Sequence, residues 1–262
     1  MVEIHYHLLH GVDDGPKDIE ASLLLAEASI AEGVTHIVST PHANSQYNFN
    51  AEVNNERLVE LRQHLSDRIT LALGCDFHLS EENLIEFDKN PSKFTINKGR
   101  YLLVEFSDFG IPRSITGALS KMIGNGVVPI ITHPERNILL ATEPDRLAEW
   151  LRIGCLIQIT AGSLSGRFGP EAMSVSQQLL KKNWVHLVAS DAHSIKSRPP
   201  AMSTAHAAIK KRCGQETADR LCIDNPFRIF NGSALPEQPE AADIRPKRAS
   251  SSRGLFSRIF QS

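Results

Sequence analysis

Short apolar runs alternate with longer amphipathic segments along most of the chain. Segment 18–32 (DIEASLLLAEASIAE) repeats apolar residues at spacings of three and four, which predicts a helix. The β-branched run 33–40 (GVTHIVST) follows it and predicts a strand, and Gly33 suits the end of the helix between them. The same pattern of apolar runs and helical segments continues to about residue 190.

Together with a first strand around His5 and His7, the apolar runs amount to seven strands. Further strands are predicted at 68–76, 100–106, 127–133, 155–160 and 184–190, and helices at 51–65, 115–126, 143–154 and 169–183. Strands separated by helices are typical of βα units and of a mainly parallel sheet. The expected fold class is therefore α/β.

The composition changes near the C-terminus. Residues 236–262 are rich in proline, serine and charge, which predicts a disordered tail after a globular domain at 1–235. The end of the tail, 252–260 (SRGLFSRIF), interleaves arginine with leucine, isoleucine and phenylalanine. Such a segment is compatible with a basic amphipathic helix that contacts a membrane surface or a partner. The alternative is a solvated terminus.

The bulk composition is that of a soluble globular protein. Apolar residues make up 41% of the chain and charged residues 22%, and the formal net charge of −2 gives no reason to expect nucleic-acid binding. The N-terminus lacks the features of a signal peptide, and no apolar run reaches the ~18 residues of a membrane span. The four cysteines are scattered, as expected for thiols in a reducing compartment, so a cytoplasmic location is predicted.

Residues that bind protons or metal ions gather at the predicted strand ends. Six of the seven strands carry such residues, and only the strand segment LIQIT (156–160) offers no ionisable side chain. The candidates are His5, His7, His42, Asp76, Glu105, His133, Asp191 and His193, with Asp13 and Asp14 in the loop after the first strand. Because the carboxyl ends of parallel strands share one rim, we expect these side chains to converge.

The chemistry of these residues predicts a metal centre. His5 and His7 are two residues apart, so both rings point to one face of a strand. Histidine and carboxylate without cysteine suit Zn²⁺, Mn²⁺ or Fe²⁺ and argue against an iron–sulfur cluster. The number of candidates indicates two or three ions. Closely spaced ions need a bridging carboxylate, which Asp76 or Glu105 would supply.

Two arginines stand beside the candidate ligands. Arg136 follows His133 by three residues, and Arg198 follows His193 by five. Because guanidinium groups pair with phosphate oxygens, ions and arginines at one mouth predict phosphoester hydrolysis, with water activated by the ions as the nucleophile. A cysteine nucleophile is not expected, because the water activated by the ions takes that role.

At these residues the sequence resembles the PHP superfamily, and within it the bacterial CpsB/CapC/YwqE type. The resemblance runs from about residue 3 to residue 232. It is carried by the motifs HYHLLHGVDDGP, IVSTPH, LVEFS, ITHPER, LVASDAH, SRPP and DNPFRIF. The combination of GVDDGP, SDAH and SRPP is specific to this type. The C-terminal tail lies outside the resemblance.

The resemblance implies a fold and a ligand set. The implied fold is a distorted (β/α)₇ barrel, TIM-like in its alternation, which agrees with the seven predicted strands. The implied ligands are His5, His7, Asp76 and Asp191 for one ion, Asp76, Glu105 and His133 for a second with Asp76 bridging, and Asp14, His42 and His193 for a third. Arg136 and Arg198 would contact the phosphate.

The resemblance also implies an activity: a manganese-dependent protein tyrosine phosphatase of capsule or exopolysaccharide operons. The expected partner is the tyrosine-rich tail of a membrane tyrosine kinase that controls polysaccharide export. Three alternatives stay open: a small-molecule phosphomonoesterase, a phosphodiesterase, and a non-catalytic regulator stabilised by its ions. Assembly into a homo-oligomer is left open as well, because the type includes ring-forming relatives.

Three positions depart from the type. Asp76 stands where glutamate is usual, and its carboxylate is one methylene shorter, so a bridging role requires the strand to approach the ions more closely. Glu3 replaces an aspartate, and we expect it to orient a ligand histidine without binding the ion itself. Ala43 replaces a histidine and removes an additional contact.

Overall fold

The computed structural model describes residues 1–244. Most of the predicted disordered tail, 236–262, and all of the predicted amphipathic helix at 252–260 lie outside the described residues. Its strands are β1 (Val2–Tyr6), β2 (His36–Ser39), β3 (His42–Ala43), β4 (Thr70–Leu73), β5 (Asp76–His78), β6 (Tyr101–Glu105), β7 (Val128–Thr132), β8 (Leu156–Thr160) and β9 (Leu187–Ala189). They form two sheets, β1-β2-β4 and β3-β5-β6-β7-β8-β9, and every strand pair within these sheets is parallel. The predicted α/β class with parallel sheets is confirmed.

In two places the chain leaves a strand of one sheet and enters the other sheet two residues later. Thr40 and Pro41 separate β2 from β3, because proline has no N–H to donate to a ladder. Gly74 and Cys75 separate β4 from β5. A Cβ atom on Gly74 would lie 3.0 Å from Val38 Cγ1, so glycine is what allows the chain to pass so close to the neighbouring strand.

The first and last strands meet at their carboxyl ends. Tyr6 and Ala192 form a parallel bridge, and the amide of His7 donates to the carbonyl of Ala192 at 3.0 Å. The amide of Asp191 donates to the carbonyl of His5 at 3.1 Å. These bonds fix the segment after β9 beside the end of β1, and so bring together two regions that carry predicted metal ligands.

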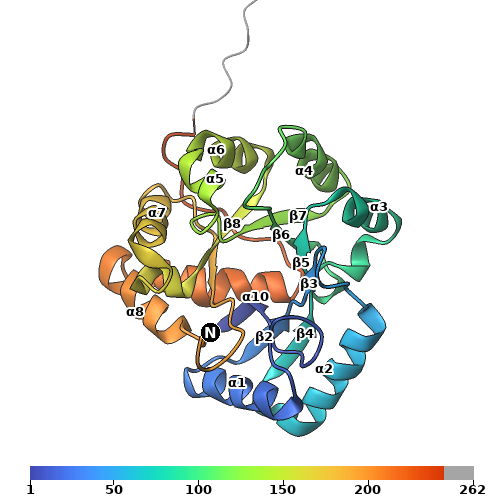
Figure 1. Cartoon of the computed structure of the whole chain (residues 1–262). Coiled ribbons are helices and arrows are strands. Elements are labelled where there is room, and N and C mark those ends of the chain that lie inside the picture. The colour runs from blue at the N-terminus through green and yellow to red at the C-terminus, as the bar shows by residue number, and fades with distance from the viewer. Residues whose placement is uncertain (245–262) are drawn as a thin grey trace, which may run out of the picture.

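Helices surround the strands (Figure 1). They are α1 (Ile19–Ala31), α2 (Ala51–Leu65), α3 (Glu81–Lys89), α4 (Ile115–Gly124), α5 (Ile138–Thr142), α6 (Pro144–Ile153), α7 (Gly169–Lys181), α8 (Met202–Cys213), α9 (Gln215–Asp219) and α10 (Asn225–Phe230). Asp18 and Asn50 cap α1 and α2 by accepting hydrogen bonds from amides of the first turn. Within residues 1–244, the helices are too short or too polar to cross a membrane.

The apolar core has two parts. The larger cluster fills the space between strands and helices, and the smaller includes Ile4, Leu103, Ile130 and Leu187 from four strands. Phe230 of α10 belongs to the smaller cluster and is buried against it. Because apolar side chains occupy this part of the interior, the buried histidines and carboxylates lie toward the carboxyl ends of the strands.

The described residues beyond 235 pack back on the domain. Trp184 donates its indole N–H to the carbonyl of Ala242 at 2.8 Å, and the amide of Ala242 donates to the carbonyl of Lys182 at 2.9 Å. Gln238 accepts hydrogen bonds from Arg220 and Asn225. The boundary at 235 stays a prediction, and these bonds define how to test it.

Candidate metal centre

The structure brings all nine predicted ligands together at the carboxyl ends of the strands. They come from β1, β3, β5 and β6 and from the segments after β1, β7 and β9. Four groups have ligand atoms within 4.8 Å of one another: His7, Asp14, His42 and His193; His5, His7 and Asp76; His5, His133 and Asp191; and His42, Asp76 and Glu105. Because the groups share members, they form one continuous cluster, which is named here the ligand cluster.

Asp76 occupies the middle of the ligand cluster. Its Oδ2 oxygen lies 3.4 Å from His5 Nε2 and 3.1 Å from His42 Nδ1. The residue is fully buried, yet neither carboxylate oxygen has a hydrogen-bond donor. An oxygen placed between two sets of histidines is suited to bridge two cations, and the aspartate reaches this position despite its shorter side chain.

The open side of the cluster is formed by Asp14. Its Oδ1 oxygen lies 3.2 Å from His193 Nε2 and 3.4 Å from His42 Nε2. The rings of His7 and His193 face each other with their centroids 3.8 Å apart. The Asp14 side chain is 43% exposed, so this group is the part of the cluster that solvent and a substrate reach most easily.

The observed grouping differs in detail from the implied ligand sets. Asp14, His42 and His193 do share a group, and His7 joins them. His133, expected with Asp76 and Glu105, instead groups with His5 and Asp191, although its Nε2 is 3.5 Å from Glu105 Oε1. The division of the ligands among individual ions therefore stays a prediction.

Two turns with positive φ aim ligands into the cluster. His133 follows β7 with φ 33°, and Asp191 follows β9 with φ 53°. Such values are uncommon for residues other than glycine and cluster at functional sites. Gly15 has a different role: a Cβ atom there would lie 2.8 Å from the carbonyl oxygen of His7, so only glycine lets the loop fold over this ligand.

Two residues outside the predicted ligand sets contact the Nδ1 nitrogens of ligand histidines. Gln158 Oε1 lies 2.8 Å from His5 Nδ1, and Asp13 Oδ2 lies 2.7 Å from His7 Nδ1. Such partners fix the ring orientation and leave Nε2 free for a metal ion. Gln158 is not found by a search for ionisable residues, because its side chain carries no charge. The sequence signal for it is an amide side chain between two isoleucines of a buried strand.

The expectation that Glu3 orients a ligand histidine is wrong. Its Oε2 oxygen accepts from the amide of Ser190 at 2.9 Å. Gln158, not Glu3, contacts Nδ1 of His5. Full burial raises the pKa of Glu3 to about 8. Glu3 therefore fixes the end of β9 beside β1, one step removed from the ligands.

Both predicted phosphate-binding arginines contact Asp191. Arg136 and Arg198 each donate to its Oδ2 oxygen, while Oδ1 faces His5 and His7 at 3.4 Å. The guanidinium of Arg136 also lies 4.3 Å from the centroid of the Phe168 ring, in a cation–π contact. The arginines therefore stand at the edge of the ligand cluster, where they can bind an anion that sits on it.

Charges within the cluster are strongly coupled. Burial alone would lower the pKa of His5 and His42, but facing carboxylates raise these values to about 9 and about 11. Burial would raise the pKa of Asp76, yet the histidines hold it well below its usual range. Without a cation, protons on histidine balance the carboxylates. Divalent cations would replace those protons, so we expect metal affinity to fall in acid.

Unpaired buried atoms show that the residues of the ligand cluster suit divalent cations. His5 Nε2, His7 Nε2, His42 Nδ1 and both oxygens of Asp76 are buried without hydrogen-bond partners. Buried polar atoms are normally paired, and five unpaired atoms aimed at one another are costly unless something binds them. Nitrogen and carboxylate oxygen are the donors that Mn²⁺, Fe²⁺ and Zn²⁺ accept.

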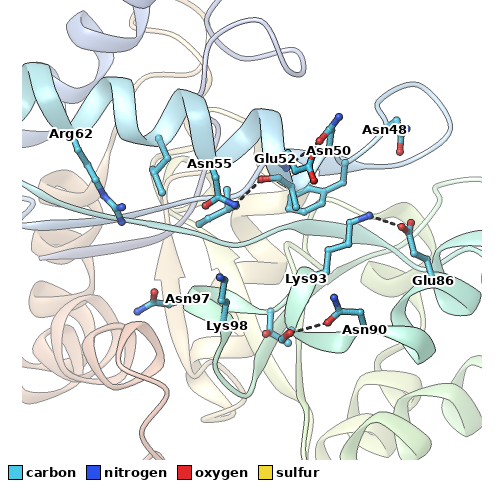
Figure 2. A pocket seen from close by; sticks show the side chains of 16 residues that line it. Asn48, Asn50, Glu52, Asn55, Arg62, Glu86, Asn90, Lys93, Asn97 and Lys98 are labelled. Carbon is cyan, nitrogen blue, oxygen red and sulfur yellow. Dashed lines mark hydrogen bonds and ion pairs between the residues drawn. The ribbon is translucent and has the colours of Figure 1, made fainter.

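A separate cleft lies away from the ligand cluster. Its volume is about 940 Å³, and it is bordered by α2 on one side and by residues 90–98 on the other (Figure 2). Asn55 and Arg62 of α2 face Lys98 across it, and Lys93 pairs with Glu86 at one end. None of the nine predicted ligands lines this cleft. Its lining contains no histidine, so it is not the metal centre.

A parallel α/β fold with buried histidines and carboxylates at the carboxyl ends of its strands is the arrangement of metal-dependent hydrolases built on βα units. The profile of one family, described as capsular polysaccharide synthesis, CpsB/CapC, matches residues 1–231. The chain belongs to this family.

Individual relatives support this family assignment. The chain is 38% identical to CapC of Staphylococcus aureus, over 95% of this chain and 98% of the relative. It is 34% identical to the tyrosine-protein phosphatase CpsB of Streptococcus pneumoniae, over 88% and 98%.

A comparison with solved structures also supports the family assignment. A structure described together with YwqE of Bacillus subtilis and CpsB of Streptococcus pneumoniae, which are called metal-dependent tyrosine phosphatases, superposes with a TM-score of 0.85 at 30% identity. That match covers 92% of this chain and 99% of the other. Histidinol phosphate phosphatase of Lactococcus lactis superposes with a TM-score of 0.55 at 13% identity, which shows a shared fold alone.

Proposed function

We propose that this protein is a metal-dependent protein tyrosine phosphatase that acts on phosphotyrosine in a protein of capsule or exopolysaccharide synthesis. The observation that carries the proposal is the set of unpaired buried ligand atoms around Asp76, beside two arginines that converge on Asp191. The family, and the metal-dependent tyrosine phosphatases among its members, support the substrate class.

The proposed ion sites use the ligand cluster. His5, His7, Asp76 and Asp191 would hold one ion, Asp76, Glu105 and His133 a second, and Asp14, His42 and His193 a third, with Mn²⁺ as the expected metal and Fe²⁺ or Zn²⁺ as alternatives. When bound, such ions lower the pKa of water toward neutrality and stabilise negative charge on a phosphoryl group.

The protein's own residues perform the remaining tasks. Arg136 and Arg198 would exchange part of their contact with Asp191 for the oxygens of the phosphoryl group and stabilise its charge. Asp191 and the ring of Phe168 hold the Arg136 guanidinium in place before substrate arrives, which reduces the entropy lost on binding. The four cysteines have no part in this mechanism.

The finer features of the fold belong to the same proposal. The two sheets would form one distorted seven-stranded barrel, because β2 continues into β3 and β4 into β5 after two residues, and Tyr6 bridges to Ala192. The domain would span 1–235. The partner would be the tyrosine-rich tail of a membrane tyrosine kinase, which places the protein in the cytoplasm, at the membrane through that partner or its own C-terminal segment.

The test combines metal analysis of the purified protein with phosphotyrosyl-peptide hydrolysis. We expect bound Mn²⁺, Fe²⁺ or Zn²⁺, loss of activity on chelation and recovery with Mn²⁺. His5→Ala and Asp191→Ala should abolish turnover, whereas replacing each cysteine with serine should not. A sugar phosphate and a phosphodiester serve as comparison substrates.

Each outcome decides between alternatives. Faster turnover of the sugar phosphate or the phosphodiester would assign a different phosphoesterase activity to the same centre. Failure to hydrolyse any of the three substrates with Mn²⁺ bound would indicate a regulatory protein stabilised by its ions. Activity that survives both the His5 and Asp191 replacements would reject the metal mechanism.

A further inference from the structure

Three large apolar side chains stand exposed on segments that follow strands bearing predicted ligands, with Ile138 at the start of α5. Phe109 is 101% exposed, Ile138 70% and Ile195 46%. They follow β6, β7 and β9, at the carboxyl ends of the strands. These three residues are named here the apolar rim. Single exposed apolar residues are common on protein surfaces, but three around one mouth require an explanation.

The chain places each rim residue close to a predicted ligand. Phe109 is four residues after Glu105, Ile138 is five after His133, and Ile195 is two after His193. Arg136 lies two residues before Ile138 and contacts Asp191. Because so few residues separate them from the ligands, the rim residues lie on the same side of the domain as the centre.

Asn137 ties the first two rim loops together. Its side-chain amide donates to the carbonyl of Ser107 at 3.2 Å and to Asp108 Oδ1 at 3.1 Å. Its Oδ1 oxygen caps the start of α5 by accepting from the amide of Leu140 at 3.0 Å. Asn137 is buried and its bonds are partly buried, so it fixes the segment of Phe109 beside the start of α5.

The third rim residue stands on a tight turn that also carries Arg198. The amides of His193 and Ser194 both donate to the carbonyl of Arg198, at 2.9 and 3.2 Å. The hydroxyls of Ser194 and Ser197 lie 2.7 Å apart inside the turn. Ile195 therefore projects from a loop whose base is fixed to the centre through Arg198 and Asp191.

We propose that the apolar rim docks the residues that flank phosphotyrosine in a protein substrate, and that it favours apolar side chains there. This inference rests on the proposed function. The ligand cluster is buried, so a phosphotyrosine must descend to it while the peptide backbone on either side stays at the mouth. Flanking side chains then lie over the rim loops, where covering Phe109 and Ile138 removes apolar surface from water.

The rim also explains how a phosphatase could select proteins over small phosphoesters. Phosphate, ions and arginines recognise the phosphoryl group alone, whatever carries it. Contacts with flanking residues add binding that only a peptide can use. The other strongly exposed apolar residues, among them Leu24 on α1 and Ile85 on α3, lie on outer helices and supply matched controls.

The experiment compares two substrates in the full-length protein loaded with Mn²⁺: a phosphotyrosyl peptide with leucine on both sides of the phosphotyrosine, and p-nitrophenyl phosphate. In the double variant Phe109→Ser/Ile138→Ser we expect the ratio of kcat/KM for the peptide to kcat/KM for p-nitrophenyl phosphate to fall about tenfold, or about 1.4 kcal/mol. Ile195→Ser should lower the ratio in the same direction. Leu24→Ser and Ile85→Ser should keep the wild-type ratio.

A second peptide, with glycine on both sides of the phosphotyrosine, separates docking from damage to the centre. The double variant should hydrolyse the glycine and leucine peptides with nearly equal kcat/KM, whereas the wild type should prefer the leucine peptide. An unchanged ratio overturns the proposal, and so does an equal loss on all three substrates. The proposal is also overturned if an oligomer dissociates in the double variant, as measured by analytical ultracentrifugation, while the ratio stays unchanged. No turnover of any substrate by the wild type would instead reject the proposed function.

Discussion

The Oε1 oxygen of Gln158 lies 2.8 Å from Nδ1 of His5, and both residues are fully buried. This bond requires a proton on Nδ1, since a carbonyl oxygen only accepts. It therefore leaves Nε2, which faces Asp76 and Asp191, as the nitrogen that gives up its proton when a cation binds. An uncharged partner from β8 thus selects the tautomer that can bind a cation.

Gln158→Leu should weaken metal binding more than it slows the loaded enzyme. Leucine keeps the volume but cannot hold the His5 ring, and losing such a partner typically costs roughly 10–100-fold in metal affinity. Calorimetric titration of the stripped protein with Mn²⁺ measures the change directly. Gln178→Leu on the outer helix α7 is the matched control. Wild-type affinity in the Gln158 variant would show that His5 needs no support.

Arg136→Ala should lower kcat/KM for a phosphotyrosyl peptide by about 10²–10³-fold, because removing one donor aimed at developing negative charge has effects of this size. Arg136→Lys should recover little, since an ammonium cannot make two parallel bonds to a phosphoryl group. Arg146→Ala, in which the lost side chain pairs with Glu143 and the carbonyl of Ile111, controls for general damage. Inhibition by inorganic phosphate should weaken in the Arg136 variants alone.

Much of the site could be predicted because strand ends converge in any parallel α/β fold. The H-x-H spacing on β1 placed two rings on one face, and the residues after β7 and β9 had to reach the same rim. The passage of the chain into the other sheet at β3 and β5 was not predicted, because it depends on how closely neighbouring strands approach. The grouping of His133 with His5 and Asp191 likewise depends on the positive φ of two turns, which no periodicity reveals.

His186 should make the protein less stable as the pH falls from about 6.5 toward 4. Burial, and then the positive charge of Arg220, lower the pKa of His186 to about 4. The unfolded chain therefore takes up a proton near pH 6.5 that the folded protein refuses, so acid favours unfolding. His186 as a whole is half-buried, and we expect a loss of about 1–2 kcal/mol.

Urea denaturation of the wild type and His186→Gln at pH 7.5, 6.0 and 5.0 isolates this contribution, since other titrating groups are common to both proteins. The free energy of unfolding of the wild type should fall more steeply than that of the variant over this range. Parallel curves would mean that His186 accepts its proton without cost in the folded state. Nδ1 of His186 accepts from the amide of Ile157 at 3.2 Å, a bond that protonation of this nitrogen would remove.

Removing residues 236–262 should destabilise the domain, whereas removing only 245–262 keeps every bond described for the segment. The longer deletion takes away the acceptor of the Trp184 indole N–H and the bonds from Gln238 to Arg220 and Asn225. At about 1 kcal/mol for each hydrogen bond lost, we expect the free energy of unfolding to drop by about 2–3 kcal/mol. Equal stability of the two truncated proteins would support a domain that ends at 235; a drop confined to the longer deletion would extend it to about residue 242.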